Sequence, residues 1–239
     1  MDYIRIQPRV AYHANMEGYY NCVVLLMVQG NNEVAEFLDG FMKRYGEFVL
    51  QKEFEVFTTA HRLNQRFLYE GNEVQDLVYP VELGTCKVDD EDKAIMNILS
   101  TNARTSITEI AKQAKIAPKS VAYRIRRLEK ENIILGYVSS PNFEKIGLKF
   151  YQLNISLKDR SIATESIAYF NATNKCLFAI ESIGRYDLVI EVHLKGEREL
   201  KEIMDGFREK FAGKYADCDV STIYQEYVVV WSPFAWKKE

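Results

Sequence analysis

Cysteine and histidine are scarce in this sequence, which limits the kinds of site that the chain can build. Among 239 residues the four cysteines, Cys22, Cys86, Cys176 and Cys218, stand singly, without a Cys-x-x-Cys pair or a histidine at metal-ligand spacing. Neither a zinc site nor a disulfide framework is indicated, so we expect no metal and no cofactor. Free thiols in a reducing cytosol are the predicted state, and with them a cytoplasmic location.

Long apolar runs and enzyme motifs are lacking too. No run of about eighteen apolar residues appears, and the N-terminus has no cationic region followed by an apolar one. His13, His61 and His193 lie far apart, and the sequence has neither a glycine-rich phosphate loop nor a nucleophile motif. We therefore predict no membrane partner, no catalytic residues and no enzyme.

The net charge is small, because 31 Lys and Arg oppose 34 Asp and Glu and leave −3. A chain of this charge is not a general binder of polyanions, so a nucleic-acid surface must be local. Residues 87–137 show such an asymmetry, with ten Lys and Arg against seven Asp and Glu. Most of these acids gather at residues 89–92.

Residues 87–140 read as three short helices in close succession. Asp89 or Asp90 can cap the first helix, and its carboxylate is favourable at the positive helix end. Ser106 has the spacing of a capping box for the second helix, and Pro118 suits the first position of the third. The pattern predicts a helix-turn-helix.

The third helix is predicted to have one apolar and one cationic face. At 100° per residue, Val121, Ile125 and Leu128 fall together on the inward side. The residues that point away are Lys119, Tyr123, Arg126, Arg127 and Lys130. A cationic helix in isolation is more often a solvated surface, but three capped helices with a tight turn favour a helix that enters the major groove of double-stranded DNA. The candidate DNA-binding residues are Lys119, Ser120, Tyr123, Arg124, Arg126 and Arg127.

This region resembles the winged helix-turn-helix of the Lrp/AsnC (feast/famine) transcriptional regulators. The resemblance is carried by Val88–Leu99, Asn102–Arg104, Glu109–Ala111, Val121–Glu129 and Ile133–Tyr137. It implies a sequence-specific DNA-binding regulator with a ligand-sensing domain. The sequence departs from the family at Ala117, where a capping Ser is common; losing that cap costs roughly 1 kcal/mol and puts a first-turn phosphate contact in doubt.

Both flanks of the helical module have α+β patterns. Residues 141–239 predict the order βαββαβ, a ferredoxin-like arrangement similar to the sensing and oligomerisation domain of Lrp/AsnC proteins. The expected strands are 150–157, 177–181, 188–194 and 220–231, and the expected helices are 161–172 and 200–211. Residues 1–68 predict a strand at 21–28, a helix over 34–45 and a strand at 54–59. Residues 69–86 are interpreted as a linker, or alternatively as containing a strand at 76–79.

The two flanks also repeat each other, at an offset of 196 − 30 = 166 positions. Gly18 matches Gly184, Tyr20 matches Tyr186, and the run Asp-Gly-Phe recurs at 39–41 and 205–207. We therefore predict that residues 1–68 are a second, incomplete ferredoxin-like domain without its opening strand and helix. Either this copy is abbreviated or the chain is part of a longer tandem protein with another helix-turn-helix upstream.

A candidate effector site lies at Gly184, Arg185, Tyr186 and Asp187. Gly-x-Tyr-Asp sits beside the effector pocket in the family, which implies a small amino-acid-like effector, with Asp187 accepting a hydrogen bond from its ammonium group. The alternative is that Gly184 serves a tight turn with positive φ and Tyr186 packs. In the first copy Asn21 replaces the aspartate, which favours a structural role there. The two copies are expected to pair with each other in one chain, or alternatively with copies in a second chain.

The resulting hypothesis is a regulator that acts as a homodimer or a larger homo-oligomer. Two alternatives stay open at this point. One is an enzyme like the siroheme decarboxylases, which resemble this family in fold. The other is a metabolite-sensing or interaction module that no longer binds DNA.

Overall fold

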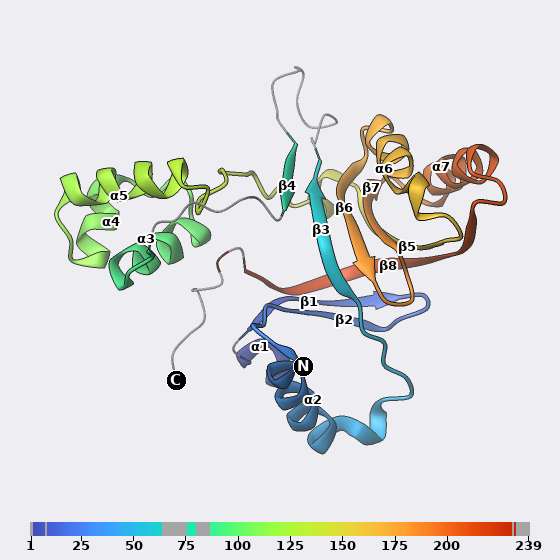
Figure 1. Cartoon of the computed structure of the whole chain (residues 1–239), viewed down its shortest axis with the longest axis horizontal. Helices are drawn as coiled ribbons and strands as arrows, with labels where there is room; N and C mark the ends of the chain where they lie inside the picture. Colours follow the sequence, from blue (N-terminus) through green and yellow to red (C-terminus); the bar gives the residue numbers. More distant parts are fainter. Residues whose placement is uncertain (1, 8, 64–75, 80–86, 231, 233–239) are drawn as a thin grey trace.

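The computed structural model describes residues 2–7, 9–63, 76–79, 87–230 and 232. The described strands form one sheet of eight strands in the order β2-β1-β8-β5-β7-β6-β3-β4. A separate module of three helices lies to one side of this sheet (Figure 1). No described helix is long and apolar enough to cross a lipid bilayer.

The second repeat has the predicted βαββαβ order. Its elements are β5 (Lys149–Leu157), η3 (Arg160–Ile162), α6 (Ala163–Ala172), β6 (Cys176–Ile183), β7 (Leu188–Leu194), α7 (Glu197–Lys210) and β8 (Tyr215–Val229). Neighbouring strands are antiparallel in the order β8-β5-β7-β6. The main hydrophobic core lies between these strands and the two helices, where Phe170, Phe207 and Phe211 are completely buried. Alternating apolar residues along β5 and β7 supply the other side of that core.

The first repeat contains a different set of elements. They are α1 (Asp2–Ile6), β1 (Val10–Glu17), β2 (Cys22–Leu26), α2 (Asn31–Tyr45), η1 (Gly46–Phe48), β3 (Val56–Arg62) and β4 (Leu77–Tyr79). Shifted by 166 positions, β1 coincides with β6, and β2, α2 and β3 coincide with β7, α7 and the second half of β8. The repeat in the sequence is therefore a repeat in the structure. A strand over 10–17 was not among the predicted elements, because polar residues such as His13 and Asn15 interrupt its apolar pattern.

The two repeats exchange their last strands. β8 continues past its own repeat and pairs with β1, while β3 pairs with β6 of the second repeat. The registers agree: Glu17↔Thr222 corresponds to Ile183↔Val56 after the shift of 166 positions, and three further pairs on each side match in the same way. The chain thus pairs with itself about a pseudo-two-fold axis. Ala14, Met16 and Ile223 form a small buried core between the repeats.

The central module has three helices, α3 (Asp90–Thr101), α4 (Ile107–Ala114) and α5 (Pro118–Lys130). Asp89 caps α3 and forms a reciprocal capping box with Asp92, while Ser106 caps α4 by accepting from the Glu109 N–H. The core of the module contains Ile95, Ile110 and Val121. Residues 131–148 follow without a strand and contain only the short helix η2 (Glu144–Ile146).

The segment between the repeat and the module differs from a plain linker. Within the predicted linker 69–86, residues 77–79 form β4, which pairs antiparallel with β3 at Ala60↔Tyr79. The alternative of a short strand at 76–79 is therefore the one that the structure supports. The other residues of that linker except Asp76, Cys86 among them, lie outside the described residues, as does position 231 at the predicted end of the last strand.

Candidate functional site

One face of α5 is exposed and cationic. Lys119, Tyr123 and Arg126 are exposed, and 66% of Tyr123 is accessible to solvent. Ser120 is half-buried, while Val121 and Leu128 are completely buried against the module. Apart from Arg127, these residues of α5 lie on the sides that helical periodicity predicts. Arg and Lys on such a face can reach phosphates or guanine edges, and a tyrosine hydroxyl can reach a phosphate.

Arg124 and Arg127 are held inside the module. The Arg124 guanidinium bonds Asp89 Oδ2 and Asp92 Oδ1, each at 2.8 Å, and also pairs with Glu91. Arg127 pairs with the other oxygen of Asp92, whose side chain is completely buried. Hydrogen bonds from the Asp92 N–H and from Arg124 hold the pKa of Asp89 at about 2.

These ion pairs join the start of α3 to the middle of α5. The acid run at 89–92 therefore neutralises two of the six candidate DNA-binding residues, in addition to capping α3. The periodicity had placed Arg127 outward, but a long arginine side chain can fold back along its own helix to reach a buried carboxylate. Lys119, Tyr123 and Arg126 are the candidates that keep an exposed position.

The start of α5 has no side-chain cap. Ala117 occupies the N-cap position in an extended conformation, and Pro118 follows at the first helical turn. α4 ends at Lys115, whose left-handed φ of 58° makes the tight turn between the two helices. The turn thus has the geometry that the sequence predicts, and the uncapped end leaves first-turn N–H groups available to an acceptor.

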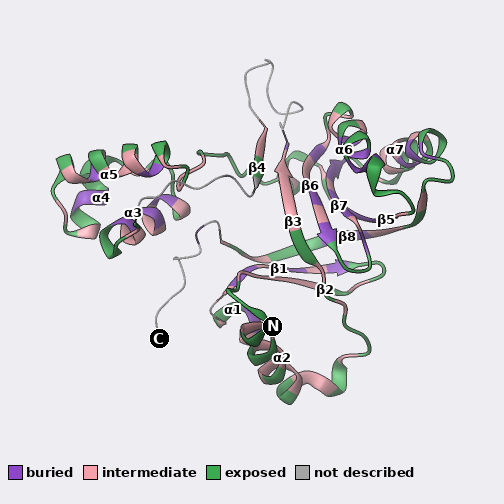
Figure 2. Ribbon diagram, in the orientation of Figure 1, coloured by how far each residue is buried: buried purple, intermediate pink, exposed green. Residues whose placement is uncertain are grey.

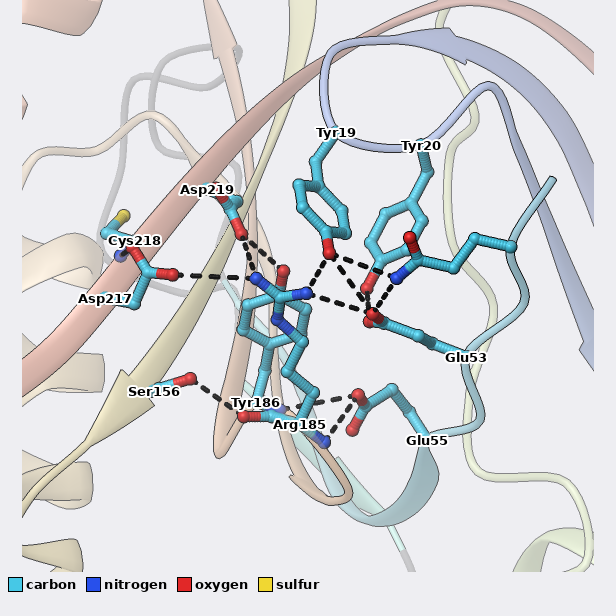
Figure 3. Close-up of polar contacts among 11 residues, drawn as sticks. Tyr19, Tyr20, Glu53, Glu55, Ser156, Arg185, Tyr186, Asp217, Cys218 and Asp219 are labelled. Atoms are coloured by element: carbon cyan, nitrogen blue, oxygen red, sulfur yellow. Dashed lines mark hydrogen bonds and ion pairs between the residues drawn. The ribbon is translucent and has the colours of Figure 1, made fainter.

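The second candidate site lies where the two tight turns of the repeats meet. Gly18 and Gly184 both have positive φ, at 140° and 159°. The next residues, Tyr19 and Arg185, contact each other across the pseudo-two-fold axis, and the following tyrosines pack edge to face with ring centroids 6.4 Å apart. Figure 3 shows the polar contacts in this cluster.

Arg185 is the centre of this turn cluster. Its guanidinium pairs with Glu53 at 2.9 Å and with Asp219 at 3.4 Å, and it lies over the Tyr19 ring, 4.1 Å from the centroid (Figure 3). The hydrogen bond to Glu53 raises the pKa of Arg185, so it is charged at all ordinary pH values. Partial burial opposes ionisation of Glu53, but hydrogen bonds from Tyr20 and Arg185 prevail and lower its pKa.

The remaining members of the predicted effector set have internal partners. Tyr186 is buried, and its hydroxyl donates to Asp219. Asp187 accepts from the Leu157 N–H at 2.7 Å and pairs with Arg160. The tight turn at Gly184 and the packing of Tyr186 are therefore as the structural alternative predicted.

Several residues of the turn cluster were not among the predicted site residues. Tyr19, Glu53, Glu55 and Asp219 lie there, although only Arg185 and its neighbours were named from the sequence. The offset of 166 positions contains the signal: Glu53 and Asp219 are equivalent, and each accepts from the tyrosine of its own repeat. A comparison of acidic residues at this offset, in addition to glycines and aromatics, would have identified Glu53 and Asp219 as a pair.

No group of three or more His, Cys, Asp or Glu suited to a metal ion occurs in the part of the chain that the structure describes. Cys22, Cys176 and Cys218 are free thiols, and Cys86 lies outside the described residues. His13 and His193 are completely buried on separate strands, and His61 pairs with Glu181.

Comparisons with known proteins agree with this geometry. Residues 89–134 match the family model of the winged helix-turn-helix DNA-binding domain. An uncharacterized HTH-type transcriptional regulator of Pyrococcus abyssi is 27% identical over 120 residues, which are 50% of this chain and 81% of that protein. The regulator LrpA of the same organism is 47% identical over 60 residues, 25% of this chain and 43% of LrpA.

Two solved structures share the fold. E. coli AsnC superposes with a TM-score of 0.51 at 20% identity, covering 59% of this chain and 94% of AsnC. A transcriptional regulator of Neisseria meningitidis in complex with L-Met superposes with a TM-score of 0.54 at 17% identity, covering 61% of this chain and 96% of that one. The chain is thus similar to Lrp/AsnC transcriptional regulators in its winged helix-turn-helix and in the fold of the βαββαβ domain that follows it.

Proposed function

We propose that the chain is a sequence-specific DNA-binding regulator that places α5 in the major groove. The observation that carries this proposal is the division of cations on α5. Arg124 and Arg127 form ion pairs with the start of α3, whereas Lys119 and Arg126 are exposed on the same helix as Tyr123. Arg126 and Tyr123 are the residues best placed for base or phosphate contacts, with Lys119 near the first turn.

The test is a salt titration of promoter DNA binding. Each phosphate contact that is lost flattens the plot of log affinity against log salt by about one unit. We expect that slope change for Arg126→Ala and Lys119→Ala, and none for Arg208→Ala, an exposed cation on α7 that serves as the matched control. Absence of DNA binding by the unaltered chain at low salt would refute the proposal.

We propose self-association because a two-fold operator needs two recognition helices. The described residues of one chain contain one such helix, α5. Inside the chain, the exchange of β3 and β8 supplies an internal pair of repeats. We propose that a homodimer or larger homo-oligomer of whole chains brings two α5 helices to one face of the duplex.

We further propose that the turn cluster is the site of an amino-acid-like effector. Arg185 can bind a carboxylate, and Glu53 or Asp219 can accept from an ammonium group, which are the two charges of a free amino acid. The related regulator of N. meningitidis was crystallised with L-Met, which supports the same ligand class. Asp187 takes part in this proposal only if an effector displaces Arg160 from it.

Calorimetry with a panel of amino acids tests the effector. Arg185→Ala should abolish binding, whereas Arg198→Ala, an exposed arginine of α7, should leave it unchanged. Equal affinity of the Arg185 variant and the unaltered chain for every ligand would contradict this assignment.

A further inference from the structure

In the part of the chain that the structure describes, the first repeat leaves uncovered three surfaces that the second repeat covers. In the second repeat, β5 pairs along β7 from Lys149↔Leu194 to Ile155↔Leu188. The equivalent strand of the first repeat, β2, is the end strand of the sheet in the described part of the chain. Its outer backbone groups are therefore available to another strand.

Side chains of the first repeat are less buried than their equivalents in the second, as expected where no strand like β5 covers them. Along β7 the four residues that face the helices are completely buried, and on α7 Met204 and Phe207 are buried as well. In the first repeat α2 has no buried residue, although its apolar face has the same spacing (Figure 2). The equivalents of the four buried residues of β7 are half-buried or exposed: Cys22, Val24, Leu26 and Val28. A cavity of about 180 Å³ also opens between the end of β2 and the start of α2.

A third surface is the segment before β3. Residues 215–221, the first part of β8, pair with β5. The pairing of β8 with β1 begins at Thr222. The equivalent residues of the first repeat, 49–55, form no strand, and there Leu50 and Phe54 are exposed. We attribute this loss of strand to the lack of a neighbour equivalent to β5.

The helix α1 covers one end of α2. α1 is equivalent to the last residues of α6, since 169 − 3 = 166 aligns Tyr169 with Tyr3. Each tyrosine hydroxyl sits against a glycine of the facing helix, where a Cβ would lie 2.3 Å from Tyr3 Oη at Gly40 and 2.6 Å from Tyr169 Oη at Gly206. The end of the covering helix thus packs on α2 as it does on α7.

We propose that β2, α2 and residues 49–55 form a docking surface for one strand-helix unit equivalent to β5 and α6. The strand, with alternating apolar residues like those of β5, adds antiparallel between β2 and residues 49–55, and its amphipathic helix packs on α2. This strand would join the β2 end of the sheet to β3. Pairing of β2 with β2 of a second copy is the weaker fit, because it would leave residues 49–55 without a partner.

The first experiment supplies the unit in trans and follows amide hydrogen exchange of the full chain. The probe is a synthetic peptide of residues 148–167, and the control is the same peptide with Leu153, Ile155 and Ile167 replaced by Ser. We expect the amides of 22–28 and 49–55 to exchange at least about tenfold more slowly with the probe only. A second variant carries residues 148–167 directly before Asp2 and should melt at a higher temperature than the same extension with the three serines.

Two results would overturn the proposal. One is unchanged exchange and melting in both the peptide and the extended-chain experiments. The other is protection of 22–28 that appears as the concentration of the chain alone is raised, together with a dimer in sedimentation that the peptide does not disperse. That second result would assign the surface to another copy of the chain.

Discussion

Replacing Asp92 by Ala should loosen the central module without touching its exposed face. The Asp92 carboxylate is completely buried, bonds Arg124 at 2.8 Å, pairs with Arg127 and accepts from the Asp89 N–H at 3.1 Å. Breaking a buried ion pair costs about 3–5 kcal/mol. The side chains of Arg124 and Arg127 are 16% and 27% exposed, so both retain some contact with water. We therefore expect the free energy of unfolding to fall by about 3 kcal/mol, the lower end of that range.

Hydrogen exchange of α3 measures this loss within the intact chain. At about 1.4 kcal/mol for each factor of ten, 3 kcal/mol corresponds to roughly 150-fold faster exchange of the α3 amides. The control is Asp90→Ala, which removes an exposed carboxylate that forms a surface ion pair with Lys93 and should change exchange less than about threefold. Equal exchange in the two variants would refute the assignment of Arg124 and Arg127 to a structural role.

Three further predictions concern the repeats. Phe207→Ala should lower the free energy of unfolding by about 3–5 kcal/mol because Phe207 is completely buried, whereas the equivalent Phe41→Ala should cost less, as chemical denaturation of both variants would show. Gly184→Ala should disrupt the turn cluster, since its φ is 159° and a Cβ would lie 2.7 Å from the Phe54 carbonyl oxygen; loss of effector binding in calorimetry checks this. Burial lowers the pKa of His193 from 6.5 to about 4, so its contribution to stability is complete above pH 6.5 and falls by about 3 kcal/mol as the pH drops through 4. The melting temperature of His193→Phe, measured against the unaltered chain, should therefore gain progressively between pH 6.5 and 4, and a constant difference would contradict it.

The sequence predicts the elements better than it predicts their partners. Apolar periodicity locates α5 and β7 because each buries one or both faces against its own repeat. It misses β1, whose burial comes from pairing with a strand that lies about two hundred residues later, as the Asn15 to Tyr227 hydrogen bond illustrates. Strand exchange leaves no local signal, because both ways of pairing bury the same faces.

The candidate site shows the same limit. Helical periodicity assigned Lys119 and Arg126 to the exposed face, and the structure confirms that position. It could not separate Arg124 from them, because the choice between DNA and a carboxylate depends on where Asp92 lies on another helix. Charge on a helix is visible in a sequence, whereas the partner of that charge is a matter of tertiary packing.

The exchanged strands also set an order of events during synthesis. β1 and β2 leave the ribosome early, but β1 cannot complete its pairing until β8 has been made, more than two hundred residues later. Contacts of such separation are slow to form, since the loop entropy is lost before the pairing is gained. The β1–β2 hairpin therefore has an unpaired β1 edge until β8 is available. We expect folding of this chain to depend on chaperones more than folding of a single βαββαβ domain does.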